Sequence, residues 1–60
     1  KMIGDIYDYN KQRIYIMSGE KRIIIPFASE EEYYYWLENG MSFSATVIFD
    51  YENKKIKKFI

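Results

Sequence analysis

Carboxylates are the only side chains of this chain whose grouping could support catalysis. The sequence contains no His and no Cys, so it lacks the usual nucleophile–base pairs, the commonest general base and the ligands of a structural zinc site. Acidic residues gather at positions 30–32, where they suit a helix start, and at Asp5 and Asp8, where we expect solvated surface. No glycine-rich phosphate loop is present. We therefore expect a protein that is not an enzyme and that uses no cofactor or metal.

Aromatic and basic side chains offer a different chemistry, the base stacking and phosphate contacts that hold single-stranded nucleic acid. Aromatic residues make up 20% of the chain, whereas nine basic and nine acidic residues cancel. A strong non-specific attraction to nucleic acid is therefore not expected, and binding would need a local basic patch. Basic residues do occur in pairs at expected turns, where ordinary solvated turn residues are an equally good interpretation: Lys11 with Arg13, Lys21 with Arg22, and Lys54 with Lys55.

The stretch SEEEYYYWLENG carries the signals of one helix. Ser29 followed three residues later by Glu32 is a capping box, and acidic residues suit the first turn. Gly40 after Asn39 is a plausible stop. The pattern predicts a helix over residues 30–38.

The aromatic run YYYW within this helix could be a stacking row or a buried face. Successive helix residues point about 100° apart, so the rings cannot form one row. Tyr33, Trp36 and Leu37 share a face. We expect this face to cover one end of the core, with a partner for the Trp36 indole N–H, and expect Tyr34 and Tyr35 to be partly exposed.

The remaining segments alternate in hydropathy and predict strands. Gly4 suggests a bulge or bend in the first of them, and Phe43, Ala45, Val47 and Phe49 should share the buried face of the fourth. The expected strands cover residues 1–10, 13–17, 22–27, 42–50 and 55–60, with turns at 18–21 and 51–54. Three strands, a helix and two strands predict a mainly β fold in a single domain over residues 1–60. The order favours a small five-stranded OB-type barrel, with an SH3-like barrel as the alternative.

Strand parity indicates which side chains of the second and third strands face outward. If Ile14, Ile16, Ile23 and Ile25 point into the core, their neighbours form a half-apolar outer surface. An apolar surface of this kind needs a partner, such as bases, a protein or the chain's own ends. The expected outward set is Arg13, Tyr15, Met17 and Ile24, which Tyr9 and Phe27 could extend.

Residues 4–17, GDIYDYNKQRIYIM, resemble the opening of a bacterial cold-shock domain, G-x-V-K-W-F-N-x-x-K-G-F-G-F. Residues 23–27, IIIPF, and 37–45, LENGMSFSA, stand where the family has V-F-V-H-F and L-x-x-G-x-x-V-x-F. The resemblance covers most of the chain and implies the OB fold and a nucleic-acid-binding face that includes Tyr15 and Met17. Departures include Asp8 at a stacking Trp position and Ile24 and Pro26 in place of a Phe and a His.

We therefore hypothesise that the protein is cytoplasmic, has no membrane segment, and binds single-stranded RNA or DNA weakly and with little dependence on sequence. The alternative is a protein contact or self-association through the same half-apolar face. The expected binding residues are Tyr9, Lys11, Arg13, Tyr15, Met17, Ile24, Phe27, Lys54 and Lys55.

Overall fold

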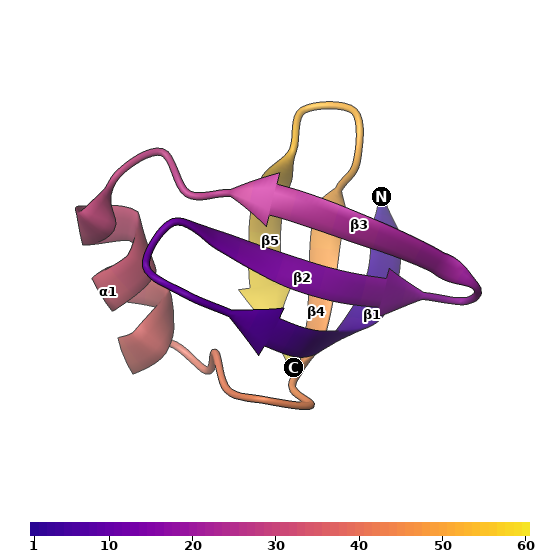
Figure 1. Ribbon diagram of the computed structural model, residues 1–60, viewed down its shortest axis with the longest axis horizontal. Coiled ribbons are helices and arrows are strands. Elements are labelled where there is room, and N and C mark those ends of the chain that lie inside the picture. Colours follow the sequence, from indigo (N-terminus) through magenta and orange to yellow (C-terminus); the bar gives the residue numbers. More distant parts are fainter.

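The computed structural model describes residues 1–60 as one antiparallel five-stranded sheet and one short helix (Figure 1). The elements are β1 (Met2–Tyr9), β2 (Arg13–Ser18), β3 (Lys21–Pro26), α1 (Glu30–Glu38), β4 (Thr46–Asp50) and β5 (Lys55–Phe59). The strand order is β3-β2-β1-β4-β5, so β3 and β5 are the two edges and the sheet is not closed into a barrel. The predicted fold class is thus confirmed as mainly β with one helix.

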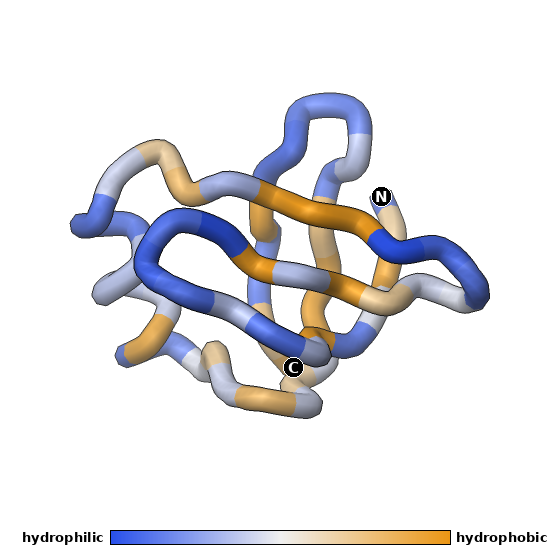
Figure 2. Tube along the Cα trace, viewed as in Figure 1, coloured by the Kyte–Doolittle hydropathy of each residue, from blue (hydrophilic) through white to orange (hydrophobic).

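The long strand β1 joins the two halves of the sheet. It pairs with β4 from Met2 to Asp5 and with β2 from Asp5 to Tyr9. In Figure 1, β2 and β3 cross in front of β4 and β5, so the sheet folds over itself. Figure 2 shows hydrophobic stretches along β3 and within β2 and β4. The buried core consists of Ile6, Ile14, Ile16, Ile23, Ile25, Trp36, Met41, Val47, Phe49 and Ile56.

The predicted parity of β2 and β3 is confirmed. Ile14 and Ile16 are fully buried, and Ile23 and Ile25 lie opposite them in register. Because side chains alternate along a strand, the neighbouring residues of both strands face outward. The inner face is therefore continuous and aliphatic.

The irregularity expected at Gly4 lies instead at Tyr7. The β1–β2 register shifts between Ile6 and Asp8, whereas Gly4 pairs regularly with Val47. Gly4 has another role, since a Cβ placed there would lie 2.6 Å from Ile16 Cγ2 and 2.7 Å from the Met17 carbonyl oxygen. Glycine is thus required by a close approach between strands, and the bulge sits three residues further along.

The fourth strand begins later than its hydropathy pattern predicts. β4 starts at Thr46, and residues 42–45 form an irregular connection in which Ser44 has a positive φ of 69°. Ser44 N–H donates to the Ile6 carbonyl at 2.9 Å, so this connection still follows β1. Phe43, expected to be buried, is 61% exposed. Alternation continues through residues 42–50, but the positive φ at Ser44 breaks the extended backbone that inward alternation needs.

Helix α1 has the predicted bounds and a capping arrangement close to the predicted one. Ser29 Oγ accepts from Glu32 N–H at 3.4 Å, and Glu32 Oε1 accepts in return from the N–H of Ala28 at 2.6 Å. The second carboxylate oxygen of Glu32 lies 3.4 Å from Trp36 Nε1, so the indole N–H has the expected partner. Glu32 thus joins the helix start to the buried indole. No helix of this chain has the length and apolar character that a membrane span requires.

The helix covers one end of the folded sheet through its aromatic side chains. Trp36 packs against Phe59 at 5.4 Å between ring centroids, and Tyr33 against Phe27 at 5.7 Å. The prediction that Leu37 shares this buried face is wrong, because its side chain is 37% exposed. Met41, which follows the helix and donates its N–H to the Trp36 carbonyl, is buried instead. The chain after α1 turns back under the helix and supplies this apolar contact.

Trp36→Ala should lower the free energy of unfolding by about 3–5 kcal/mol, because it removes the largest buried group of α1. Leu37→Ala, one residue further along the same helix, should cost less than about 1 kcal/mol. Urea denaturation followed by circular dichroism measures both. Equal losses for the two variants would contradict the orientation of α1.

Gly4→Ala should destabilise the protein by about 1–3 kcal/mol, the usual cost of overpacking, because the new methyl group meets Ile16 and the Met17 backbone. The control is Gly19→Asn in the β2–β3 turn, where nothing lies within 4 Å of the added Cβ and φ is +62°. Asn tolerates this left-handed conformation. Thermal melts of both variants test the contact, and a Gly4→Ala melt at the wild-type temperature would refute it.

Candidate nucleic-acid interface on the outer sheet face

The registers of β1, β2 and β3 arrange an ordered outer face. Tyr15 on β2 lies opposite Ile24 of β3 and Asp8 of β1. Since residues directly opposite each other project to the same side of a sheet, these three side chains are neighbours. The next row of outward-facing side chains, two residues further along β2, consists of Arg22, Met17 and Asp5. The outer face therefore has an apolar centre on β2, carboxylates on β1 and an arginine on β3.

Tyr7 adds a second aromatic ring that the sequence interpretation missed. Alternation from the buried Ile6 turns Tyr7 outward, and the bulge turns Asp8 to the same side. The Tyr7 ring lies 6.0 Å from that of Tyr15 at an interplanar angle of 51°, and it is 44% exposed. The guanidinium carbon of Arg22 lies 6.0 Å from the Tyr7 ring centroid. An exposed ring, a half-buried ring and a cation thus meet on the outer face.

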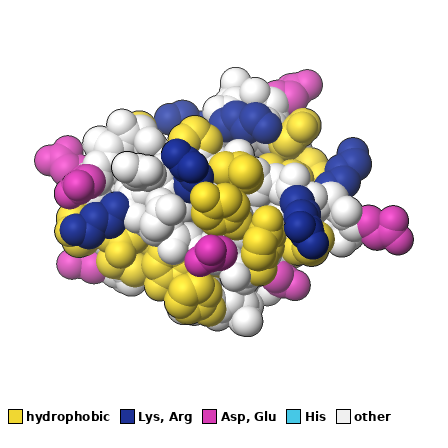
Figure 3. All heavy atoms as spheres, viewed as in Figure 1, with side chains coloured by type: hydrophobic (Ala, Val, Ile, Leu, Met, Phe, Trp, Pro, Cys, Tyr) yellow, Lys and Arg dark blue, Asp and Glu magenta, His cyan; other side chains and the backbone are white.

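The centre of the outer face is apolar and accessible. Ile24 is 50% exposed, and Tyr15 and Met17 are half-buried. Figure 3 shows hydrophobic side chains across the middle of the molecule on this side, with Lys and Arg side chains around them and an acidic group among them. Arg13 also faces outward, opposite Pro26, and borders Tyr15 along β2. These residues can offer stacking surfaces and phosphate contacts.

Two predicted binding residues, Tyr9 and Phe27, do not extend the outer face. Tyr9 lies opposite the buried Ile14 and stacks on Phe43, with 4.8 Å between ring centroids and 28° between planes. Tyr9 and Phe27 both pack against the core beside Tyr33 of α1. The bulge explains the position of Tyr9, since the extra residue reverses the side on which β1 presents it. The rings of Tyr9 and Phe27 thus pack at the end of the core that α1 covers.

Lys11 lies in the β1–β2 loop, next to the helix. Its Nζ is 6.0 Å from the Tyr34 ring centroid. Interaction with the Tyr34 hydroxyl, and then the charge of Glu30, raises the pKa of Lys11 above its usual value. Lys11 is therefore cationic at neutral pH, but it stands beside α1 and not over the apolar centre of the outer face.

Lys54 and Lys55 belong to the β4–β5 turn. Lys54 Nζ lies 3.8 Å above the Tyr51 ring, a cation–π contact within the turn. Asp50, opposite Lys55, organises the turn by accepting from Asn53 Nδ2 at 2.8 Å, and the Asn53 hydrogen bonds lower the pKa of Asp50. Figure 1 places the β1–β2, β2–β3 and β4–β5 loops on three different sides of the molecule. The basic pairs therefore do not form one patch, and Arg13 and Arg22 are the cations that border the outer face.

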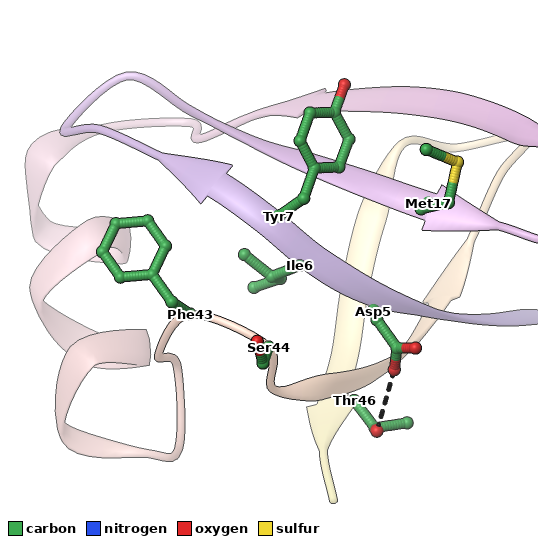
Figure 4. A pocket seen from close by; sticks show the side chains of 7 residues that line it. All are labelled: Asp5, Ile6, Tyr7, Met17, Phe43, Ser44 and Thr46. Carbon is green, nitrogen blue, oxygen red and sulfur yellow. Dashed lines mark hydrogen bonds between the residues drawn. The ribbon is translucent and has the colours of Figure 1, made fainter.

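A surface hollow of about 540 Å³ adjoins the outer face at the bulge (Figure 4). The buried Ile6 lies between its two sides, with Tyr7 and Met17 from the outer face on one and Phe43 and Ser44 on the other. At one end, Asp5 Oδ1 accepts a hydrogen bond from Thr46 Oγ1 at 3.0 Å. The hollow thus lies beside the irregular connection of residues 42–45, which stays hydrogen-bonded to Ile6 of β1.

The outer face and the adjoining hollow are thus the places where polar and aromatic groups gather. No cluster of three or more acidic side chains provides a metal site. Comparison of the chain with protein-family models, with curated proteins and with solved structures finds no match.

Proposed function

We propose that this protein binds single-stranded nucleic acid, RNA or DNA, through the outer face of β1, β2 and β3, weakly and with little dependence on sequence. The observation that carries the proposal is the pair of rings beside Arg22, formed by the exposed Tyr7 and the half-buried Tyr15. Aromatic side chains stack on every kind of base, and nearby cations contact the backbone that links the bases. Met17 and Ile24 extend the apolar surface around the rings.

The charges around the rings predict how a strand would lie. Asp8 and Asp5 stand on the β1 side, opposite Tyr15 and Met17, and would repel phosphates. Arg22, on β3, and Arg13, at the start of β2, would attract them. The phosphates should therefore lie near Arg22 and Arg13 and away from Asp8 and Asp5, with the bases on the Tyr7 and Tyr15 rings. Two stacking rings and few cations imply a Kd on the order of 10 µM to 1 mM.

We propose further that the sheet is an OB-type barrel left open between β3 and β5. The strand order supports this, because pairing of the two edges would close the ring, and OB folds are partly open five-stranded barrels. Their oligonucleotide surface is the face of strands 2 and 3, where Tyr15 and Met17 lie. The cold-shock resemblance fits the same face, with Tyr7 supplying a ring next to Asp8, the residue at the family's stacking Trp position.

A protein contact through the same face is the second candidate, and the exposure of Ile24 on β3 favours it. β3 is an edge strand with one unpaired side, and an exposed edge can pair with another strand. A second copy of the chain could then cover Ile24 and Met17.

Tyr15→Ala should weaken binding of every single-stranded sequence by about 1–3 kcal/mol, because it removes one stacking surface. Tyr35→Ala is the matched control, since Tyr35 is an exposed tyrosine on α1, away from the outer face. Fluorescence anisotropy of labelled oligonucleotides at low salt measures both. Equal losses for the two variants would place the binding surface elsewhere.

Arg22→Gln should flatten the salt dependence of binding by about 0.7 in the log–log slope, the value for one phosphate contact with a single strand. Lys54→Gln, in the β4–β5 turn, should leave the slope unchanged.

If no oligonucleotide binds at millimolar protein concentration and low salt, nucleic-acid binding is refuted. Self-association would then be favoured if the sedimentation coefficient rises with protein concentration and if Ile24→Lys abolishes that rise.

A further inference from the structure

The hollow beside the bulge is large enough for a small planar group. Its volume of about 540 Å³ lies within the range of about 300–1,000 Å³ that small-ligand sites occupy. Tyr7 and Met17 line both the hollow and the outer face, so the hollow opens directly beside the Tyr7 ring. Phe43 supplies a further exposed aromatic wall.

Asp5 is the one charged residue that lines the hollow. Its Oδ1 accepts from Thr46 Oγ1 at 3.0 Å, which orients the carboxylate at one end of the hollow (Figure 4). An ionised carboxylate has about four acceptor sites and no donor, so Asp5 retains capacity to accept further hydrogen bonds. Asp8 differs, because it does not line the hollow and its Oδ1 accepts from the adjacent Tyr9 N–H at 2.8 Å.

A carboxylate in this position distinguishes bases by their edges. Cytosine presents an exocyclic amino group, which donates to Asp or Glu, whereas uracil has a carbonyl oxygen at the same position of a ring of the same size. The N3–H of uracil lies between two carbonyl oxygens, which a carboxylate would meet at close range. A hydrogen bond to an ionised group is also stronger than one between neutral groups.

We propose that the hollow receives one base of the bound strand, and that Asp5 makes it prefer cytosine over uracil. This inference rests on the proposed function, and it assigns a role to the acidic side of the outer face. Tyr7 and Asp5 belong to the same strand, β1, and both line the hollow, so a base that enters it beside Tyr7 lies close to the Asp5 carboxylate. The bases stacked on Tyr7 and Tyr15 can then be of any kind, whereas the neighbouring base in the hollow is preferably cytosine.

The test compares oligo(rC) and oligo(rU) of equal length, titrated into the full chain at neutral pH and low salt. The two ligands have the same charge and ring size, so their difference reports the base edge. Wild type should bind oligo(rC) about fivefold more tightly than oligo(rU). Asp5→Asn should bring the ratio close to one, because an amide can both donate and accept, while it keeps the acceptor for Thr46.

Glu52→Gln is the matched control, since it removes the same charge from the β4–β5 turn, outside the hollow. It should leave the ratio of the two affinities at the wild-type value. Equal affinities in wild type, or a preference that survives in Asp5→Asn, would overturn the role of Asp5 while binding through the outer face stands. Binding of neither oligonucleotide would overturn the proposed function and this inference together.

Discussion

The pairing of β1 with two partners is the constraint on which the rest of the structure depends. This strand must serve β4 with its first half and β2 with its second, and Asp5 pairs with both. Gly4 permits the close approach to Ile16 and the Met17 backbone that this crossing requires. Because the sheet folds over at β1, aliphatic side chains from both halves meet in one core without disulfides or metal. For a domain of 60 residues, such a shared core is the main source of stability.

The bulge in β1 connects this constraint to the proposed function. It places Tyr7 and Asp8 on the same side of the strand, so a ring lies beside Tyr15 and a carboxylate lies opposite it. The same irregularity turns Tyr9 inward, where it stacks on Phe43. A chain with no net charge thereby acquires an outer face with carboxylates on β1 and arginines on β2 and β3. This polarity suits a weak and oriented contact with a strand.

Sequence reasoning succeeded where the signal is local. The Ser29–Glu32 pair marked the start of α1, and alternation fixed the parity of β2 and β3. It failed where the backbone is irregular: the bulge at Tyr7 arises from the β1–β2 register, and the exposure of Phe43 from the positive φ of the neighbouring Ser44. The candidate site was half predictable for the same reason. Arg13, Tyr15, Met17 and Ile24 follow from parity, whereas the separation of Lys11 from Lys54 and Lys55 depends on loops that tertiary structure places on different sides.

The most direct test of the central claim is a two-dimensional NMR titration of the protein with a single-stranded oligonucleotide at low salt. Binding through the outer face predicts that the largest shifts occur at Tyr7, Tyr15 and Met17. Tyr9 and Phe27, which pack beneath α1, should shift little. The largest shifts at Tyr9 and Phe27, with Tyr7 and Tyr15 unmoved, would contradict the account.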